Sequence, residues 1–287
     1  MKVGIIGAGA WGTALGISSA RGGADVTMWA FDGTARDFDG IAMPKNLIVT
    51  GNMADLRDMD VWLIVTPAAY FRETVRRARE FYSGMPIIIC TKGADPETGE
   101  FMSEILGTEL PQCTDFGVLS GPQFAGEVAA GVKTGSTIAG TPTARAAAHD
   151  ALRELHLVDS ADVVGAQICG VGKNAVALIC GYNFVAAAGE NERALIFTRA
   201  WDDVVRLGCA MGARVETFLA LCGIGDLFLS ATSQTSRNFS GGMAIARGEA
   251  PTGTVEGVFA LSGLVRRASD MGLETPTLNE MKNKMNL

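Results

Sequence analysis

The pattern of hydrophobic and polar residues divides the chain into two parts of different character. In the first part, short apolar runs rich in β-branched residues alternate with longer segments whose apolar residues recur at helical spacing. The predicted strands cover 2–6, 25–30, 61–65, 86–90, 116–119, 134–139 and 158–160, and the predicted helices cover 13–23, 70–81, 100–106, 124–130 and 143–155. Such alternation predicts an α/β fold in which a mostly parallel, doubly wound sheet carries helices on both faces.

Helical patterns dominate after residue 165, and the strand signal fades. The pattern therefore predicts two domains, an α/β domain at 1–163 and a mostly α-helical domain at 164–287. With 287 residues, 48% of them hydrophobic, the chain can fill the cores of both.

The longest apolar run, residues 165–189, contains a single charged side chain, Lys173. Five glycines and the absence of flanking aromatic and basic anchors favour a buried central helix over a membrane span. In a water-excluded cleft, desolvation would lower the pKa of a lysine from about 10.4 towards roughly 7 to 8, a range suited to a general acid/base. The alternative is a lysine at a helix end whose ammonium group extends to water.

Composition excludes several classes of function. The 24 basic and 31 acidic residues give a net charge of -7 without a basic stripe, which argues against nucleic acid as a partner. The six cysteines are scattered, form no CxxC pair and have only two histidines to assist them, so we expect reduced thiols and no metal site. We expect a soluble, cytoplasmic protein without a membrane span, and leave a monomer and a homodimer both open.

A glycine-rich turn follows the first predicted strand. Gly7, Gly9 and Gly12 stand in the spacing of a dinucleotide-binding turn between a strand and a helix, and Ala10 and Trp11 lie within it. Asp32 follows Gly12 by twenty residues, where a ribose-binding carboxylate is expected. The alternative is an unrelated glycine turn.

The proton partner of a nicotinamide enzyme can be sought by elimination. His149 lies in the helix predicted at 143–155 and His156 ends it, both away from the motifs at the strand ends. No tyrosine is followed four residues later by a lysine, and zinc ligands are lacking. Lys173 therefore remains the leading candidate, and Lys92, after the strand at 86–90, is either a second functional lysine or an ordinary loop lysine.

Several motifs together resemble one enzyme family. They are GAGAWGTAL (7–15), TKG (91–93), LSGPQFAGEVAAG (119–131), GVGKN (170–174), ENERALIFTR (190–199), CGIGDL (222–227), TSQTSRN (232–238) and TVEG (254–257). Their order and spacing are similar to those of bacterial NAD(P)-dependent glycerol-3-phosphate dehydrogenases. The resemblance implies a Rossmann domain followed by a helical domain, and the reversible reduction of dihydroxyacetone phosphate to sn-glycerol 3-phosphate for glycerophospholipid synthesis.

The resemblance also implies roles for individual residues. The implied catalytic residues are Lys173 as general acid/base, Lys92 and Asp226. The implied substrate contacts are Lys92, Gly121, Gln123, Lys173, Asp226, Ser236, Arg237 and Asn238. The implied cofactor contacts are Gly7, Gly9, Ala10, Trp11, Gly12, Asp32, Lys92, Ala125, Arg237 and Glu256.

Some positions leave alternatives open. Without the resemblance, Asp226 could be a turn or capping carboxylate and Arg237 a solvated surface charge. Gln123 stands where the family usually has a small hydroxyl residue, so another small phosphorylated or carboxylated ketone is the second candidate substrate. A non-catalytic dinucleotide-binding sensor is the third reading. NAD and NADP are both candidate cofactors, and Asp32 favours NAD because a carboxylate would repel a 2′-phosphate.

Overall fold

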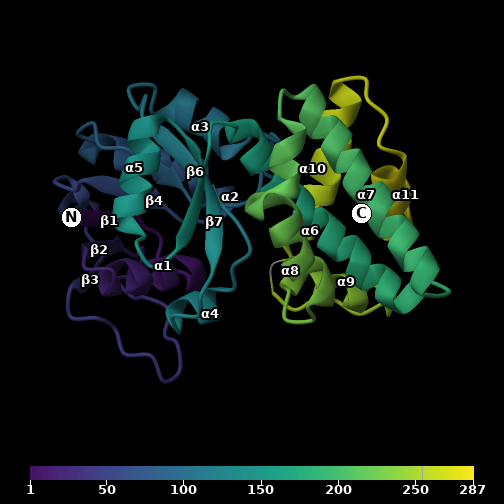
Figure 1. Cartoon of the computed structure of the whole chain (residues 1–287), viewed down its shortest axis with the longest axis horizontal. Coiled ribbons are helices and arrows are strands. Elements are labelled where there is room, and N and C mark those ends of the chain that lie inside the picture. Colours follow the sequence, from purple (N-terminus) through teal and green to yellow (C-terminus); the bar gives the residue numbers. More distant parts are fainter. Residues whose placement is uncertain (254) are drawn as a thin grey trace. The chain divides into compact units, whose positions relative to one another are not determined.

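The computed structural model describes residues 1–253 and 255–287 and comprises two compact units (Figure 1). The first unit consists of Met1–Lys92, Glu100–Leu119 and Gln123–Val163, and the second of Gly93–Gly99, Ser120–Pro122 and Val164–Leu287. Thr254, the first residue of the TVEG motif, lies outside the described residues.

The first unit is built on one sheet, which has eight strands among the described residues. The strands are β1 Lys2–Ile6, β2 Asp25–Trp29, β3 Leu47–Thr50, β4 Val61–Ile64, β5 Ile87–Ile89, β6 Phe116–Ser120, β7 Gly135–Gly140 and β8 His156–Ser160. Their order is β3-β2-β1-β4-β5-β6-β7-β8, and β1 pairs in parallel with both β2 and β4. The first six strands thus have the Rossmann order, which confirms the predicted fold class.

One neighbouring pair of strands departs from the parallel pattern. The Thr141 N–H, just after β7, donates to the carbonyl oxygen of Phe116, the first residue of β6, at 3.2 Å. The end of β7 therefore lies beside the beginning of β6, so that these two strands run in opposite directions.

Helices cover both faces of the sheet, as the alternating pattern predicts. On one face α1 Ala10–Arg21, α4 Ala125–Ala129 and α5 Pro142–Ala151 share a core with side chains such as Val3, Ile5 and Leu63. Strand residues of the other parity, including Trp62 and Ile64, are buried as well. These residues belong to the opposite face, where α2 Ala68–Ala78 and α3 Met102–Glu109 pack. The first unit also contains two short 3-10 turns, Met53–Leu56 and Arg79–Phe81.

The sheet differs from the prediction in two details, a missed strand and the end of one helix. Strand β3, the apolar run LIVT, was not predicted. It lies at the sheet edge, where Ile48 is 64% exposed. The helix predicted to run to residue 155 ends at Ala151. His156 does not end that helix but begins β8, since its N–H donates to the carbonyl oxygen of Thr134 at 3.0 Å.

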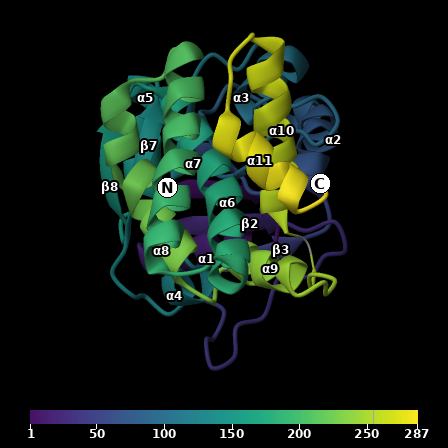
Figure 2. The ribbon, with the colours of Figure 1, turned by 90° about the vertical axis from the view of Figure 1, so that its right-hand side faces the viewer.

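The second unit is helical, as predicted. It contains α6 Val163–Ala186, α7 Glu190–Ala210, a 3-10 turn Val215–Leu219, a π-helical turn Leu221–Gly225, α8 Asp226–Thr232, α9 Arg237–Ala246, α10 Glu256–Asp270 and α11 Pro276–Lys284. Figure 2 shows α6 in the middle of this unit. Helix α9 approaches α6 so closely at Gly181 that a Cβ there would lie only 1.8 Å from the Phe239 carbonyl oxygen.

Helix α6 is the long apolar segment around Lys173. It is long and apolar enough to span a membrane by composition, but 83% of its most apolar window is buried inside the protein. It is therefore the core helix expected for this segment. Lys173 lies near the middle of α6 and not at its head, because the helix already begins at Val163.

Candidate active site

The glycine turn between β1 and α1 has the geometry that its sequence predicts. Gly7 has a φ of +113°, which favours glycine, and a Cβ on Gly12 would lie 1.9 Å from the Gly7 carbonyl oxygen. A Cβ on Gly9, in contrast, would meet no atom of the described residues within 4 Å, its chain neighbours aside. Gly7 and Gly12 are thus required by the fold itself, whereas the side of the turn at Gly9 is open to a ligand.

The first turn of α1 is arranged to receive an anion. Gly9 is its N-cap and carries no side chain to cap the first N–H groups of the helix. The Trp11 indole Nε1–H is buried and has no hydrogen-bond partner among residues 1–253 and 255–287. A buried donor without a partner is costly, so this indole N–H is an exception that needs a physical explanation.

The loop after β2 is tied to the same turn. The Arg36 N–H donates to the Ala8 carbonyl oxygen at 3.0 Å, which holds the 32–36 segment beside the glycines. Asp32 accepts a hydrogen bond from the Thr34 N–H at 3.0 Å. Bonds from the Thr34 backbone and side chain hold the pKa of Asp32 below its ordinary value, so this exposed carboxylate is negatively charged at neutral pH.

Further predicted residues lie after the later strands. Thr91 Oγ1, following β5, donates to the Thr66 carbonyl oxygen at 2.7 Å, which joins the ends of β4 and β5. Lys92 is the next residue and is half-buried. Gln123 precedes α4, in which Ala125 is the first helical residue. The side-chain oxygen and nitrogen of Gln123 are both buried without a hydrogen-bond partner in the described part of the chain.

Lys173 is paired with Asp226 inside the second unit. Lys173 Nζ lies 3.1 Å from Asp226 Oδ1, and the side chains are 11% and 1% exposed. Lys173 also donates to Ser230 Oγ at 2.9 Å, and Ser230 in turn donates to Asp226 Oδ1 at 3.3 Å. The carboxylate stabilises the ammonium form of Lys173, which is the form that can protonate a ketone oxygen during reduction.

The structure explains why Asp226 can be buried as an anion. It is the first residue of α8, so its carboxylate lies at the positive end of the helix dipole. Ser230 lies four residues later, on the same face of the same helix. The sequence analysis did not identify Ser230, although its i, i+4 spacing from Asp226 is the signal that could have found it.

The predicted substrate residues at the start of α9 have different environments. Arg237, the first residue of α9, is exposed. Ser236 is the N-cap, and its Oγ accepts from the Phe239 N–H at 3.4 Å, so its own hydrogen can be donated elsewhere. The Asn238 side chain is turned inward and bonds Asn174 and the Gly257 N–H.

The predicted residues are divided between the two units. The first unit holds Gly7, Gly9, Ala10, Trp11, Gly12, Asp32, Lys92, Gln123 and Ala125, and the second holds Gly121, Lys173, Asp226, Ser236, Arg237, Asn238 and Glu256. The geometry brings Lys173 and Asp226 together, and it connects Asn238 to Glu256 through Asn174. The implied role of Lys92 and Lys173 as contacts of one substrate stays a prediction.

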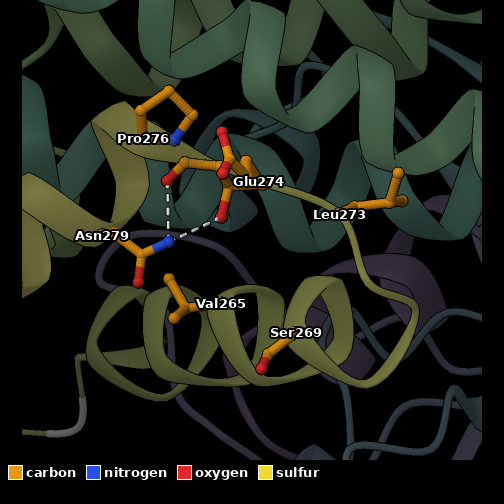
Figure 3. Close-up of a pocket in the computed structure, with 7 residues that line it drawn as sticks. Val265, Ser269, Leu273, Glu274, Pro276 and Asn279 are labelled. Atoms are coloured by element: carbon orange, nitrogen blue, oxygen red, sulfur yellow. Dashed lines mark hydrogen bonds between the residues drawn. The ribbon is translucent and has the colours of Figure 1, made fainter.

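A pocket of about 330 Å³ lies elsewhere in the second unit, between α10 and the start of α11 (Figure 3). Its lining residues are Val265, Ser269, Leu273, Glu274, Thr275, Pro276 and Asn279. Asn279 Nδ2 bonds the carbonyl oxygen and the Oγ1 of Thr275, at 2.9 and 3.1 Å. No predicted site residue lines this pocket, so it is separate from the site of Lys173.

Comparisons with known proteins agree with this arrangement. The family model described as the NAD-dependent glycerol-3-phosphate dehydrogenase N-terminus matches residues 2–146, and the model for the C-terminus matches residues 162–285. The NAD(P)+ glycerol-3-phosphate dehydrogenase of Parvibaculum lavamentivorans is 36% identical, with 96% of this chain and 89% of that protein covered. That of Paramagnetospirillum magneticum is 40% identical, with 83% and 92% covered.

A solved structure is similar over almost its whole length. The crystal structure of glycerol-3-phosphate dehydrogenase from Coxiella burnetii has a TM-score of 0.90 and 28% identity, and the alignment covers 99% of this chain and 94% of that chain. The matches include both the unit with the glycine turn and the unit with the buried lysine. The chain therefore belongs to the NAD-dependent glycerol-3-phosphate dehydrogenase family.

Proposed function

We propose that this protein interconverts dihydroxyacetone phosphate and sn-glycerol 3-phosphate with NAD(H) or NADP(H), and that Lys173 is the general acid/base. The observation that supports this most strongly is the buried group of Lys173, Asp226 and Ser230 in the second unit of a chain from this family. A lysine held as an ammonium in an apolar helix has no evident structural purpose, because a hydrophobic side chain would pack there at lower cost.

Lys173 would supply the proton during reduction. The bound nicotinamide supplies a hydride to the ketone carbon, and the C=O bond becomes a C–O⁻ group. Lys173 stabilises this oxyanion and transfers a proton to it, which leaves a neutral amine that is reprotonated from water. Asp226 holds the ammonium group in place, and Ser230 fixes the direction of both side chains.

The residues of the first unit fit a dinucleotide. The open side of Gly9, the first N–H groups of α1 and the Trp11 indole would hold the pyrophosphate region, and Asp32 would accept from the ribose hydroxyls. Ala125, Lys92, Arg237 and Glu256 are the other proposed cofactor contacts. We propose NADH as the preferred reductant, because the ionised Asp32 would repel a 2′-phosphate.

The substrate phosphate would bind at the beginning of α9. The exposed Arg237 offers a planar, permanently charged donor group, and Ser236 can donate its hydroxyl hydrogen. Backbone N–H groups at the start of this helix add to the attraction for an anion. Lys92, Gly121, Gln123 and Asn238 complete the proposed substrate set.

Steady-state kinetics with the purified protein test this function. We expect turnover of dihydroxyacetone phosphate with NADH, and a decrease in kcat of about 10² to 10⁴ for Lys173→Met without a change in NADH affinity. The exposed Lys133 provides a control, and Lys133→Met should behave like wild type. Equal turnover by the Lys173 variant, with folding verified by circular dichroism, would contradict the assigned role.

We further propose a cytoplasmic enzyme whose product enters glycerophospholipid synthesis, and a homodimer as its assembly. Light scattering after size-exclusion chromatography distinguishes the dimer from a monomer. A substrate panel that includes 2-keto acids tests the second candidate, a different small phosphorylated or carboxylated ketone, which the unusual Gln123 suggests.

A further inference from the structure

Three helices of the second unit are joined by a closed set of hydrogen bonds, of which the bond to Glu256 is partly buried and the other two are buried. Asn174 Nδ2 on α6 donates to Glu256 Oε2 on α10 at 3.1 Å, and Asn238 Nδ2 on α9 donates to Asn174 Oδ1 at 2.8 Å. The Gly257 N–H donates to Asn238 Oδ1 at 2.9 Å. Because Glu256 and Gly257 are consecutive, these bonds close a ring, which we call the amide ring (Asn174, Asn238, Glu256 and Gly257).

The bond from the Gly257 N–H determines how the side-chain amides of Asn238 and Asn174 are oriented. A backbone N–H can only donate, so the Asn238 oxygen must face Gly257 and its NH₂ group must face Asn174. Asn174 then presents its own NH₂ group to Glu256, whose carboxylate is an acceptor. The Glu256 carboxylate is therefore the terminal acceptor, and its bond with Asn174 joins α6 to the start of α10.

The surrounding packing prevents other partners from replacing these bonds. Asn174 is 2% exposed and Asn238 is 8% exposed, so water has little access to either amide. A Cβ on Gly257 would lie 2.6 Å from the Asn174 carbonyl oxygen, which shows that α10 contacts α6 through its backbone. The amide ring thus lies at a close backbone contact between α6 and α10, and Asn238 connects α9 to it.

We propose that Glu256 is a positioning residue, which sets the placement of Lys173 relative to Arg237 through the amide ring. Lys173 directly precedes Asn174 on α6, and Arg237 directly precedes Asn238 on α9. The inference rests on the proposed function, in which Lys173 protonates the ketone oxygen and Arg237 binds the phosphate. These two substrate groups are separated by fixed covalent bonds, so the spacing of the two cations must match, and an error of about 1 Å can cost about 10² in rate.

Substitutions at Glu256 separate this role from a cofactor contact. Glu256→Ala removes the terminal acceptor and is expected to lower kcat/KM for dihydroxyacetone phosphate by about 10 to 10². Glu256→Gln keeps an amide oxygen that can accept from Asn174, and should therefore lower kcat/KM less than Glu256→Ala does. Because Glu256 is also a proposed cofactor contact, NADH affinity is measured for both variants, and kinetics are run at saturating NADH. The exposed Glu249 gives the control variant Glu249→Gln.

The ratio of kcat/KM for dihydroxyacetone phosphate to that for dihydroxyacetone is the decisive readout. Only the phosphorylated substrate needs both cations, so Glu256→Ala should lower this ratio, whereas a merely loosened structure would reduce both activities equally. An unchanged ratio in an active enzyme would refute the inference, and the ratio is independent of any change in NADH affinity because both substrates are assayed at saturating NADH. Absence of wild-type turnover would instead refute the proposed function.

A reciprocal exchange provides a second test that does not depend on the alanine variant folding. Asn174→Asp places a carboxylate against Glu256, and should lower the same ratio by about tenfold or more because like charges repel. When Glu256→Gln is added, the amide NH₂ of residue 256 can donate to the carboxylate of residue 174, which reverses the direction of the original bond. Asn238 still donates to residue 174. The double variant should recover most of the ratio, and a double variant as poor as Asn174→Asp alone would overturn the proposal.

Discussion

The buried ion pair between Lys173 and Asp226 makes a quantitative prediction for stability. The two charges are 3.1 Å apart and their side chains are 11% and 1% exposed. At an effective dielectric constant of about 20 their attraction is about 5 kcal/mol, and it offsets the cost of taking both charges out of water. Asp226→Asn has nearly the same shape but leaves the ammonium without its counter-charge. We expect the free energy of unfolding to decrease by about 3 to 5 kcal/mol.

Removing the second charge should restore part of this loss. Lys173→Met alone leaves an anion that still has Ser230 and the positive end of α8 beside it, so its expected cost is smaller, about 1 to 3 kcal/mol. In the double variant no buried charge remains unpaired. It should therefore be more stable than Asp226→Asn by at least about 1 kcal/mol.

Urea denaturation of the four proteins at pH 7, followed by circular dichroism, measures this double-mutant cycle. Catalysis does not enter the measurement, so the result bears on the ion pair alone. If the two single changes add, with the double variant the least stable protein of the four, Lys173 and Asp226 do not interact and the reasoning is refuted.

Three further predictions address the cofactor, the phosphate and the first unit. Because Asp32 is ionised beside the glycine turn, kcat/KM should be higher for NADH than for NADPH, and the opposite order would contradict the proposed ribose contact. Arg237→Ala should cost about 2 to 5 kcal/mol in kcat/KM for dihydroxyacetone phosphate and much less for dihydroxyacetone, whereas equal losses would remove Arg237 from the phosphate site. Glu109 of α3 accepts from Arg76 and Arg72 of α2 at 2.9 and 2.7 Å, and these two guanidinium groups, Arg76 first, hold the pKa of Glu109 below its ordinary value of 4.5. Glu109→Gln should therefore lower the free energy of unfolding by about 1 to 3 kcal/mol at pH 7. This difference should disappear as the pH falls through the folded-state pKa of Glu109, because a lowered pKa stabilises the protein only while the carboxylate is ionised. A difference that persists at acid pH would show that the charge is not responsible.

The sheet of the first unit was predictable because its strands are buried on both faces. Runs such as Val61–Ile64 are continuous and apolar, which is the pattern of a strand covered by helices on two sides. Strand β3 carries a similar run, LIVT, and was nevertheless missed. Its partly exposed residues, such as Ile48 at the sheet edge, show that an apolar run does not by itself tell an edge strand from a central one. The boundary between α5 and β8 was missed for a related reason, because His156 joins the sheet through a backbone bond that no side-chain pattern records.

Single positions of the site were predictable where the backbone or the surroundings impose a residue type. Gly7 and Gly12 are examples, as each is required by a positive φ or a close backbone contact. The connections between positions were not predictable. Ser230 bonds a lysine 57 residues earlier, and Asn174 bonds partners 64 and 82 residues away. Such pairs depend on how helices pack, and helical periodicity shows only which face of each helix is buried.

The pairing of Lys173 with Asp226 lies between these two cases. Lys173 is the only charged residue of an apolar run, and Asp226 is the only charged residue between Glu216 and Arg237. Each segment alone predicts a costly buried charge, and the cost is reduced most when two such charges of opposite sign meet. Among 31 acidic residues, an acid isolated in a second apolar segment is therefore the partner that electrostatics favours for an isolated buried lysine. The same argument could therefore have named Asp226 as the carboxylate that faces Lys173 in the folded protein.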